Sequence, residues 1–371
     1  MRLGEVCNVK TGKLDANASS PSGKYPFFTC ANEPLKINTF SYDCECCLVA
    51  GNGDLNVKYY SGKFDAYQRT YIVESKNKNK LNTKYLYYLL ENRLEHLREV
   101  SIGGIIKYIK LNNLTDIIIK YLPFYEQHSI ANELDTISAV LTKQKKQYEL
   151  LGELVKSKFI EMFGDPVANP MKWKMKQMSE CGTLKNGINY AKNDSGYSVR
   201  CLGVGDFADS YTIEKMNEIS FINLASKPAD EYLLQDGDIV FVRSNGNREL
   251  VGRSVEVFPQ SEKLTFSGFC IRYRNTSSEL LTVYLNHALH LPTFRTELLS
   301  GGRGANIQNV NQQTLGALMI PLPPLAIQQQ FAAFVNNIET SKTKLKTEII
   351  QTETLYKTLM QKYFGDKGEQ E

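Results

Sequence analysis

The chain has 371 residues, of which 42% are apolar and 23% charged, and its formal net charge of +4 is mildly basic. This composition excludes a chain that is disordered throughout, and the length allows two globular domains with their own cores. No run of about 20 apolar residues could cross a bilayer, and the N-terminal segment has no apolar signal-peptide core, so we expect a cytoplasmic protein without membrane contact.

The first globular segment, residues 1–122, contains short β-like runs separated by Gly, Asn and Asp, such as YQRTYIVE at 67–74. A helical pattern follows at 83–97. Residues 166–322 repeat this order, with the runs GDIVFVRS and GFCIRYR before a helical segment at 280–291. Alternating β-branched and aromatic residues favour strands, so the mixture predicts an α+β fold for both domains.

Two long helices are expected, one between the domains at 123–165 and one after them at 323–366. In the first, Leu134, Leu141 and Tyr148 begin a series of apolar residues that recurs every seven positions, and the second has a similar series. A narrow apolar seam of this period suits one partner helix. We therefore expect the two helices to pack on each other within the chain as an antiparallel coiled coil.

The two helical segments are copies of one pattern. They align without a gap, so that Pro123 corresponds to Pro324 at their starts and Phe-Gly-Asp at 163–165 corresponds to the same string at 364–366. Proline just ahead of a helix and glycine at its end are typical start and stop signals. Shared ends imply that both helices occupy equivalent places in a repeated architecture.

The domains also begin alike, because GEVCNVKTG at 4–12 resembles SECGTLKNG at 179–187. Their interiors align poorly, although 64–74 corresponds loosely to 264–274. The chain is therefore expected to be a pseudo-two-fold tandem repeat. Its expected parts are a first globular domain at 1–122, a first long helix at 123–165, a second globular domain at 166–322, a second long helix at 323–366 and a tail at 367–371.

No constellation of catalytic residues is apparent. The chain lacks a GxxxxGK[ST] string for ATP hydrolysis and the Asn/Asp-Pro-Pro-aromatic string of an adenine methyltransferase. His287 and His290 have the spacing of a helical metal site but no third ligand in view, and the cysteine cluster at 43–48 has no second ligand pair. We expect no catalytic residues, no metal site and no cofactor bound by this chain.

Loops rich in Arg, Asn, Gln and Lys are the remaining candidates for chemistry. Arg and Asn form paired hydrogen bonds with guanine and adenine edges, and glycine-rich loops let a backbone approach phosphates. Polar loops of this kind are more often only solvated, so both interpretations stay open. The candidate DNA-binding residues are Lys58, Tyr59, Lys63, Gln68, Arg69, Lys107, Tyr108, Arg243, Asn245, Asn247, Arg248, Arg253, Arg303, Asn306 and Gln308.

The repeated organisation resembles the specificity subunit of a type I restriction-modification system. Both helices begin in a proline-led motif, LPPLAIQQQF at 322–331 and its degenerate copy LPFYEQHSIANEL at 122–134, and both end in Phe-Gly-Asp. GDIVFVRSNG and ELVGRS, within 237–254, also resemble the target-recognition domains of that family. The resemblance covers nearly the whole chain, although the first domain lacks the NPMKW-like segment that leads into the second.

This resemblance implies a non-catalytic subunit that binds double-stranded DNA. Each domain would read one half of a gapped target, and the paired helices would set the gap and bind two methyltransferase subunits, which carry the restriction and translocase subunits. S-adenosylmethionine, Mg and ATP would be used by those partners. The alternative is a two-headed coiled-coil scaffold that binds proteins without DNA readout. The helix residues expected at the partner interface are Gln127, Lys156, Phe163, Gln328, Lys357 and Phe364.

Overall fold

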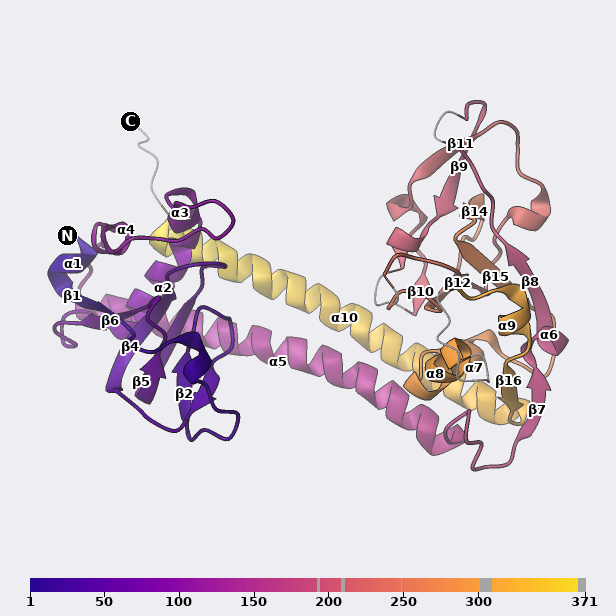
Figure 1. Cartoon of the computed structure of the whole chain (residues 1–371), viewed down its shortest axis with the longest axis horizontal. Helices are drawn as coiled ribbons and strands as arrows, with labels where there is room; N and C mark the ends of the chain where they lie inside the picture. The colour runs from indigo at the N-terminus through magenta and orange to yellow at the C-terminus, as the bar shows by residue number, and fades with distance from the viewer. Residues whose placement is uncertain (192–193, 208–210, 248, 301–308, 366–371) are drawn as a thin grey trace. The chain divides into compact units, whose positions relative to one another are not determined.

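The computed structural model describes residues 1–191, 194–207, 211–247, 249–300 and 309–365 (Figure 1). It divides into two compact units. Unit 1 comprises residues 1–146 and 345–371, and unit 2 comprises residues 147–344. Over the described residues, every helix is too short or too polar to cross a membrane.

Unit 1 is built on a six-stranded sheet with the strand order β1-β6-β4-β5-β2-β3, in which only β2 and β5 pair in parallel. Helix α2 packs on β4 and β5. One core lies between this helix and the sheet, and a second, smaller core lies among β2, β4 and β5. The elements are α1 (Leu3–Val6), β1 (Cys7–Thr11), η1 (Ala16–Ala18), β2 (Tyr25–Phe28), β3 (Leu35–Ile37), β4 (Tyr42–Ala50), β5 (Val57–Ala66), β6 (Thr70–Ser75), α2 (Thr83–Asn92), α3 (Leu94–Glu99) and α4 (Leu111–Thr115).

Unit 2 has a five-stranded sheet, β10-β13-β12-β15-β8, a three-stranded sheet, β11-β9-β14, and the pair β16-β7. Helix α7 packs on β12 and β13. The elements are β7 (Lys174–Gln177), α6 (Met178–Cys181), β8 (Gly182–Asn186), β9 (Tyr197–Leu202), η2 (Val204–Asp206), β10 (Thr212–Ile213), η3 (Met216–Glu218), β11 (Phe221–Leu224), η4 (Asp230–Tyr232), β12 (Asp238–Val242), β13 (Ser254–Val257), β14 (Leu264–Phe266), β15 (Cys270–Asn275), α7 (Thr282–Leu289), α8 (Pro292–Ser300), α9 (Gln312–Gly316) and β16 (Met319–Leu322).

The strand register confirms the internal repeat. In unit 1 β1 pairs with β6 so that Cys7 lies opposite Ser75, and in unit 2 β8 pairs with β15 so that Gly182 lies opposite Asn275. Cys7 and Gly182 already correspond in the alignment of the two domain starts, and the loose correspondence of 64–74 with 264–274, continued by one residue, matches Ser75 to Asn275. The poorly matched interiors of the two domains therefore have the same backbone pairing, which the sequence indicated only loosely.

A matching pair of glycines, Gly12 and Gly187, shows how closely two backbone segments approach each other at the same place in the two domains. A Cβ added at Gly12 would lie 2.1 Å from the carbonyl oxygen of Ala66, and one added at Gly187 would lie 2.1 Å from that of Ser267. Any side chain would collide with backbone at these distances. Both positions therefore require glycine, which explains why the two domain starts share it.

The two expected long helices are confirmed as α5 (Phe124–Phe163) and α10 (Leu325–Phe364), each of 40 residues. In unit 1 they run antiparallel, because Glu133 pairs with Tyr363 and Lys145 pairs with Glu353. In unit 2 the rings of Phe159 and Phe331 lie 5.4 Å apart, and Lys342 lies over the ring of Tyr148. The predicted seam residues are buried or half-buried throughout both helices. The α+β fold with an intramolecular antiparallel helix pair is thus confirmed.

A buried glutamine attaches the first turn of each helix to its globular unit. The amide of Gln127 donates to Lys80 O (2.9 Å) and Leu122 O (2.8 Å), and its oxygen accepts from Asn82 N (3.0 Å). Gln328 repeats this pattern in unit 2, with Glu279 O, Pro323 O and Leu281 N as its partners. Both side chains are fully buried. The partner-interface prediction is therefore wrong for these two side chains, because their polar atoms bind their own unit.

The phenylalanines at the helix ends are also internal. In unit 2 the ring of Phe163, at the end of α5, lies 4.7 Å from the ring of Tyr284. In unit 1 Phe364, at the end of α10, lies 5.2 Å from Tyr85 in the same way. Both phenylalanines are buried, so they anchor the helix ends and are not available to a partner. Gly164 then ends α5 with a φ of 74°, as the stop signal predicts.

The buried glutamine predicts a large effect of an isosteric apolar substitution. Gln127→Leu would leave two backbone carbonyls and one N–H unpaired in the core, and should lower the free energy of unfolding by about 3 kcal/mol. The matched control is Gln144→Leu in the same helix, because Oε1 of Gln144 is buried and has no partner within the described residues. That change should be neutral or stabilising. Equal losses in urea unfolding of the two variants would contradict this assignment.

Candidate nucleic-acid interface

Hydrogen bonds gather four loops of unit 1 into one group, the unit 1 loop cluster, formed by residues 30–33, 51–56, 67–69 and 101–108. Gly51 N donates to Arg69 O (2.8 Å), Gly53 N donates to Lys107 O (3.0 Å), and the amide of Asn56 donates to the carbonyl of Cys30 (2.8 Å). These bonds fix segments that are far apart in the sequence, so the cluster is built on the ends of several strands. Such a group of loops on a rigid sheet is a usual place for recognition.

Five of the predicted DNA-binding residues lie in or next to this cluster. Gln68, Arg69 and Lys107 are exposed, and Tyr108 is half-buried and bridges to Asn52. Lys58 follows the loop at 51–56 and its Nζ donates to Asn56 Oδ1. Burial lowers the pKa of Lys58, an effect that the nearby Cys30 and Glu33 oppose.

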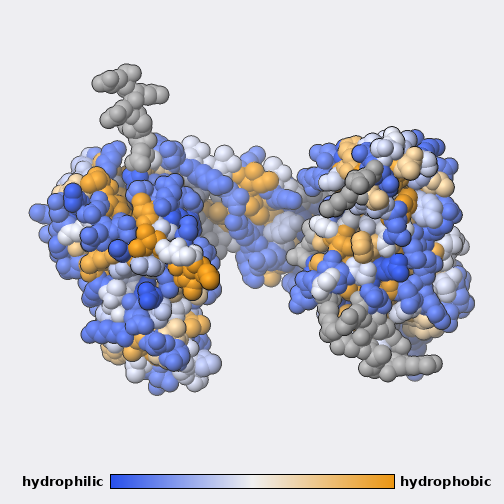
Figure 2. Space-filling model, turned by 45° about the horizontal axis from the view of Figure 1, so that its top comes forward, coloured by the Kyte–Doolittle hydropathy of each residue, from blue (hydrophilic) through white to orange (hydrophobic). Residues whose placement is uncertain are grey.

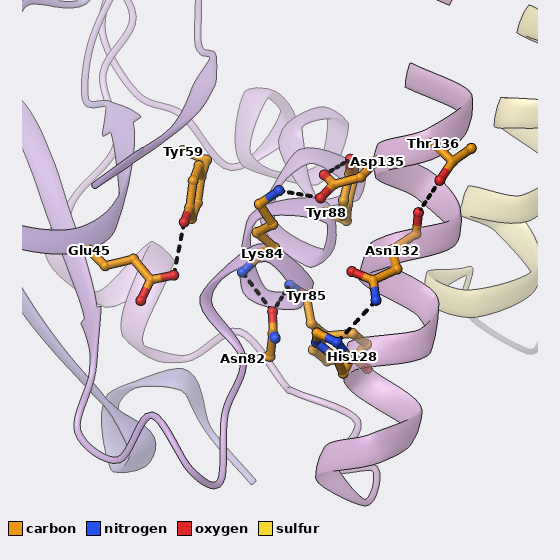
Figure 3. A network of polar contacts seen from close by, with 10 residues as sticks. All are labelled: Glu45, Tyr59, Asn82, Lys84, Tyr85, Tyr88, His128, Asn132, Asp135 and Thr136. Atoms are coloured by element: carbon orange, nitrogen blue, oxygen red, sulfur yellow. Dashed lines mark hydrogen bonds and ion pairs between the residues drawn. The ribbon is translucent and has the colours of Figure 1, made fainter. Parts of the chain in front are cut away.

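Tyr59 and Lys63 have partners outside the cluster. The Tyr59 hydroxyl donates to Glu45 Oε1 (2.9 Å), and Lys84, which lies over its ring, forms an ion pair with Asp135 of α5 (Figure 3). Burial and the Glu45 bond raise the pKa of Tyr59 to about 12. Lys63 Nζ lies 4.6 Å from the centre of the Phe40 ring. Tyr59 therefore belongs to a polar network that joins the sheet to α2 and α5.

The corresponding loops of unit 2 bring Arg243 next to the turn at 267–269. Arg243 N donates to Phe269 O (2.8 Å), and its Nη1 donates to Gly268 O (3.4 Å). Asn245 and Asn247 are exposed, and the side-chain oxygen of each accepts the backbone N–H of the residue two positions on. Arg253 Nε donates to Glu249 O (3.2 Å). The predicted residues Arg248, Arg303, Asn306 and Gln308 lie outside the described residues.

Apolar side chains on the surface were missed by the sequence-based selection, which considered only polar loops. Hydrophilic residues cover most of the face shown in Figure 2, with smaller hydrophobic patches between them. Phe269 is 62% exposed in the turn held by Arg243. On the helices, Leu154 is 47% exposed and its repeat equivalent Leu355 is 50% exposed. The gapless alignment of the two helical segments already paired these leucines, and was the available signal.

The two predicted partner-binding lysines differ from the buried helix residues. Lys156 and Lys357 are exposed at equivalent positions, two residues after Leu154 and Leu355. Lys156 Nζ also donates to Glu153 Oε1 (2.9 Å), and this bond raises its pKa. Each helix therefore presents the same exposed leucine and lysine.

His287 is buried and His290 is half-buried, and in the cysteine cluster Cys46 and Cys47 are buried while Cys44 is half-buried. His287 and His290 both stack on Tyr211, with ring centres 4.6 and 4.0 Å away. Burial lowers the pKa of His287 to about 3, so its ring is neutral at physiological pH. The residues that the structure describes contain no group of three or more His, Cys, Asp or Glu able to hold a metal ion.

Comparison with known proteins agrees with this architecture. The family model for the type I restriction modification DNA specificity domain matches residues 1–150 and 170–352. The chain therefore belongs to the family of type I restriction-modification specificity proteins.

Three relatives illustrate the range of similarity. The type I restriction enzyme EcoDI specificity subunit of Escherichia coli is 27% identical over 98% of this chain and 87% of that protein. The EcoKI specificity subunit of E. coli strain K12 is 24% identical over 74% of this chain and 62% of that protein. The crystal structure of an S subunit from M. genitalium superposes with a TM-score of 0.64 at 16% identity, covering 99% of this chain and 96% of that one.

The unit 1 loop cluster predicts a specific effect of removing one positive charge. Lys107→Ala should weaken binding of duplex DNA uniformly across sequences and reduce the slope of log affinity against log salt by about one, because one phosphate contact is lost. Lys63→Ala removes the same charge outside the cluster and should leave the slope unchanged. Titration of a labelled duplex at several salt concentrations measures both. The same slope change in the two variants would contradict the location of the interface.

Proposed function

We propose that this chain confers sequence specificity on a type I restriction-modification complex by reading the two halves of a gapped DNA target with its two units. The observation that carries the proposal is a contrast within the repeat. The loops next to the two matching strand pairs bear different side chains, whereas the two long helices share an exposed leucine and an exposed lysine at equivalent positions. Readers of different sequences have to diverge, while surfaces that bind equivalent partners have to stay alike.

Base recognition would come from the loops next to the matching strands. Arg69 and Gln68 in unit 1 and Asn245 and Asn247 in unit 2 are exposed and have side chains able to pair with purine edges in the major groove. Lys58 and Lys107 would hold the backbone of the duplex through phosphate contacts. In unit 1 these roles divide affinity from specificity.

The helices would bind two methyltransferase subunits. Leu154 with Lys156, and Leu355 with Lys357, place an apolar and a cationic side chain on the surface in the same order. Because the same exposed leucine recurs at equivalent positions of two otherwise divergent helices, it would serve two equivalent copies of one partner. One methyltransferase copy would dock at each leucine.

Catalysis would reside in the partners. S-adenosylmethionine would be used by the methyltransferase subunits, and Mg and ATP by the restriction and translocase subunits attached through them. A complex that modifies genomic DNA would act in the cytoplasm. This chain would contribute target choice and assembly.

Methylation of plasmid DNA tests the function directly. The chain alone should transfer no methyl groups, and the chain reconstituted with its methyltransferase should methylate one gapped motif, mapped by sequencing the modified adenines. Exchange of residues 176–310 for the matching part of another family member should change one half of the motif and leave the other. Methylation by the chain alone, or a change in both halves, would refute the proposal.

The repeated helix surface gives a second prediction. Leu154→Asp together with Leu355→Asp should weaken assembly with the methyltransferase by at least tenfold, because two apolar contacts are replaced by charges. The control is Leu150→Asp, which changes a 54% exposed leucine of the same helix whose repeat equivalent is Gln351. Analytical ultracentrifugation reports assembly. Equal loss from the control would place the partner elsewhere on the helices.

A further inference from the structure

The same backbone frame holds a two-residue turn in each unit. Between β5 and β6, Thr70 N donates to Tyr67 O (2.8 Å), and between β14 and β15, Cys270 N donates to Ser267 O (2.8 Å). These bonds close the turns around residues 68–69 and 268–269. Both turns occupy the same place in the repeat, because each directly precedes the strand, β6 or β15, that pairs with the first strand of its domain.

Two further bonds tie each turn to neighbouring strands in the same way. Gly51 N donates to Arg69 O and Arg243 N donates to Phe269 O, both at 2.8 Å. Gly12 N, directly after β1, donates to the carbonyl of Thr70, the first residue of β6 (3.0 Å). Gly187 N, directly after β8, donates in the same way to the carbonyl of Cys270, the first residue of β15 (3.1 Å). The turn backbones are therefore held rigidly, and the side chains at their tips project from a constant support.

The tip side chains differ completely in chemistry. Unit 1 carries Gln68 and Arg69, both exposed, and unit 2 carries Gly268 and Phe269. A fixed phenylalanine left 62% exposed forgoes the burial that normally stabilises such a side chain. An exposed apolar side chain on a rigid support, at the place where the other unit has an arginine and a glutamine, is suited to contact with a ligand, because a preorganised side chain loses little freedom on binding.

The surroundings of Phe269 fix its position further. A Cβ at Gly268 would lie 2.0 Å from Asn189 Oδ1, so the loop at 187–191 packs directly against the turn. Arg243 Nη1 donates to Gly268 O (3.4 Å), and Phe269 N donates to Ser267 Oγ (3.3 Å). Arg243, predicted to contact DNA, thus contacts the turn in this structure.

We propose that Phe269 is a specificity-determining residue of unit 2 that contacts the 5-methyl group of a thymine in the DNA half-site. Apolar side chains, phenylalanine among them, recognise thymine through this methyl group, while Arg and Gln form hydrogen bonds with guanine and adenine. The equivalent tip of unit 1, with Gln68 and Arg69, would instead read purines. The inference rests on the proposed function and names the base chemistry of one of its halves.

The experiment uses the chain reconstituted with its methyltransferase subunits. Mapping methylated adenines in a plasmid library with randomised inserts defines the motif, and the exchange of residues 176–310 assigns one half to unit 2. The binding probe is a duplex of that motif, compared with the same duplex in which deoxyuridine replaces each thymine of the unit 2 half. Deoxyuridine lacks only the 5-methyl group.

Phe269→Ser should weaken binding of the thymine duplex about tenfold or more. Deoxyuridine should weaken binding by the unchanged protein about fourfold, the effect of one buried methyl group. It should have no effect on Phe269→Ser, because the two changes remove the same contact. Affinity for a duplex without the motif should be unchanged in the variant.

The control variant is Phe221→Ser. Phe221 is 60% exposed and lies on β11, at the opposite edge of the three-stranded sheet from β14, with Arg200 over its ring. This substitution should leave both duplex affinities as they are. Because Phe269 and Phe221 are both exposed, neither change should unfold the protein.

Two results would overturn the inference while leaving the proposed function intact: wild-type affinity in Phe269→Ser, or an equal deoxyuridine effect in the variant and the unchanged protein. The proposed function itself fails separately, if the reconstituted complex methylates without a motif. The thymine contact is supported if deoxyuridine weakens binding by the unchanged protein and by Phe221→Ser but has no effect on binding by Phe269→Ser.

Discussion

The buried glutamine at the first turn of each long helix is the interaction on which the rest of this structure depends. Gln127 and Gln328 each satisfy three backbone groups that would otherwise be buried without partners. A cost of about 1–3 kcal/mol for an unpaired buried group makes any other attachment of the first turn unfavourable. Within each unit, the phenylalanine that ends the other long helix packs against a tyrosine, Tyr85 in unit 1 and Tyr284 in unit 2.

This attachment allows strong divergence elsewhere. The strand pairings and the tight glycines at 12 and 187 hold the loops in place through backbone contacts, which almost any side chain tolerates. The turn tips can then change from Gln68 and Arg69 to Gly268 and Phe269 without a change of frame. A specificity protein needs this separation, because a new target requires new side chains on an unchanged support.

The sequence predicted the elements whose physics is local or periodic. The helix bounds, the seam and the strand runs follow from apolar spacing and from stop signals such as Gly164. Four residues were predicted to lie at the partner interface because they match between the two helices, and the structure places them in the core. Gln127, Gln328, Phe163 and Phe364 match across the repeat because they build the core, and not because they face a partner.

By itself the sequence determined the tandem repeat, the two long helices and the family, since these depend on spacing along the chain and on motifs at fixed positions. Only the tertiary structure decided which loops meet. Lys107 O accepts a bond from Gly53 N, which joins segments far apart in the sequence, whereas Tyr59 contacts Glu45 of β4 and Lys84 of α2. Exposure was likewise decided by packing, because a leucine at 134 and a leucine at 154 have the same propensity, and only their neighbours bury the first and leave the second in water.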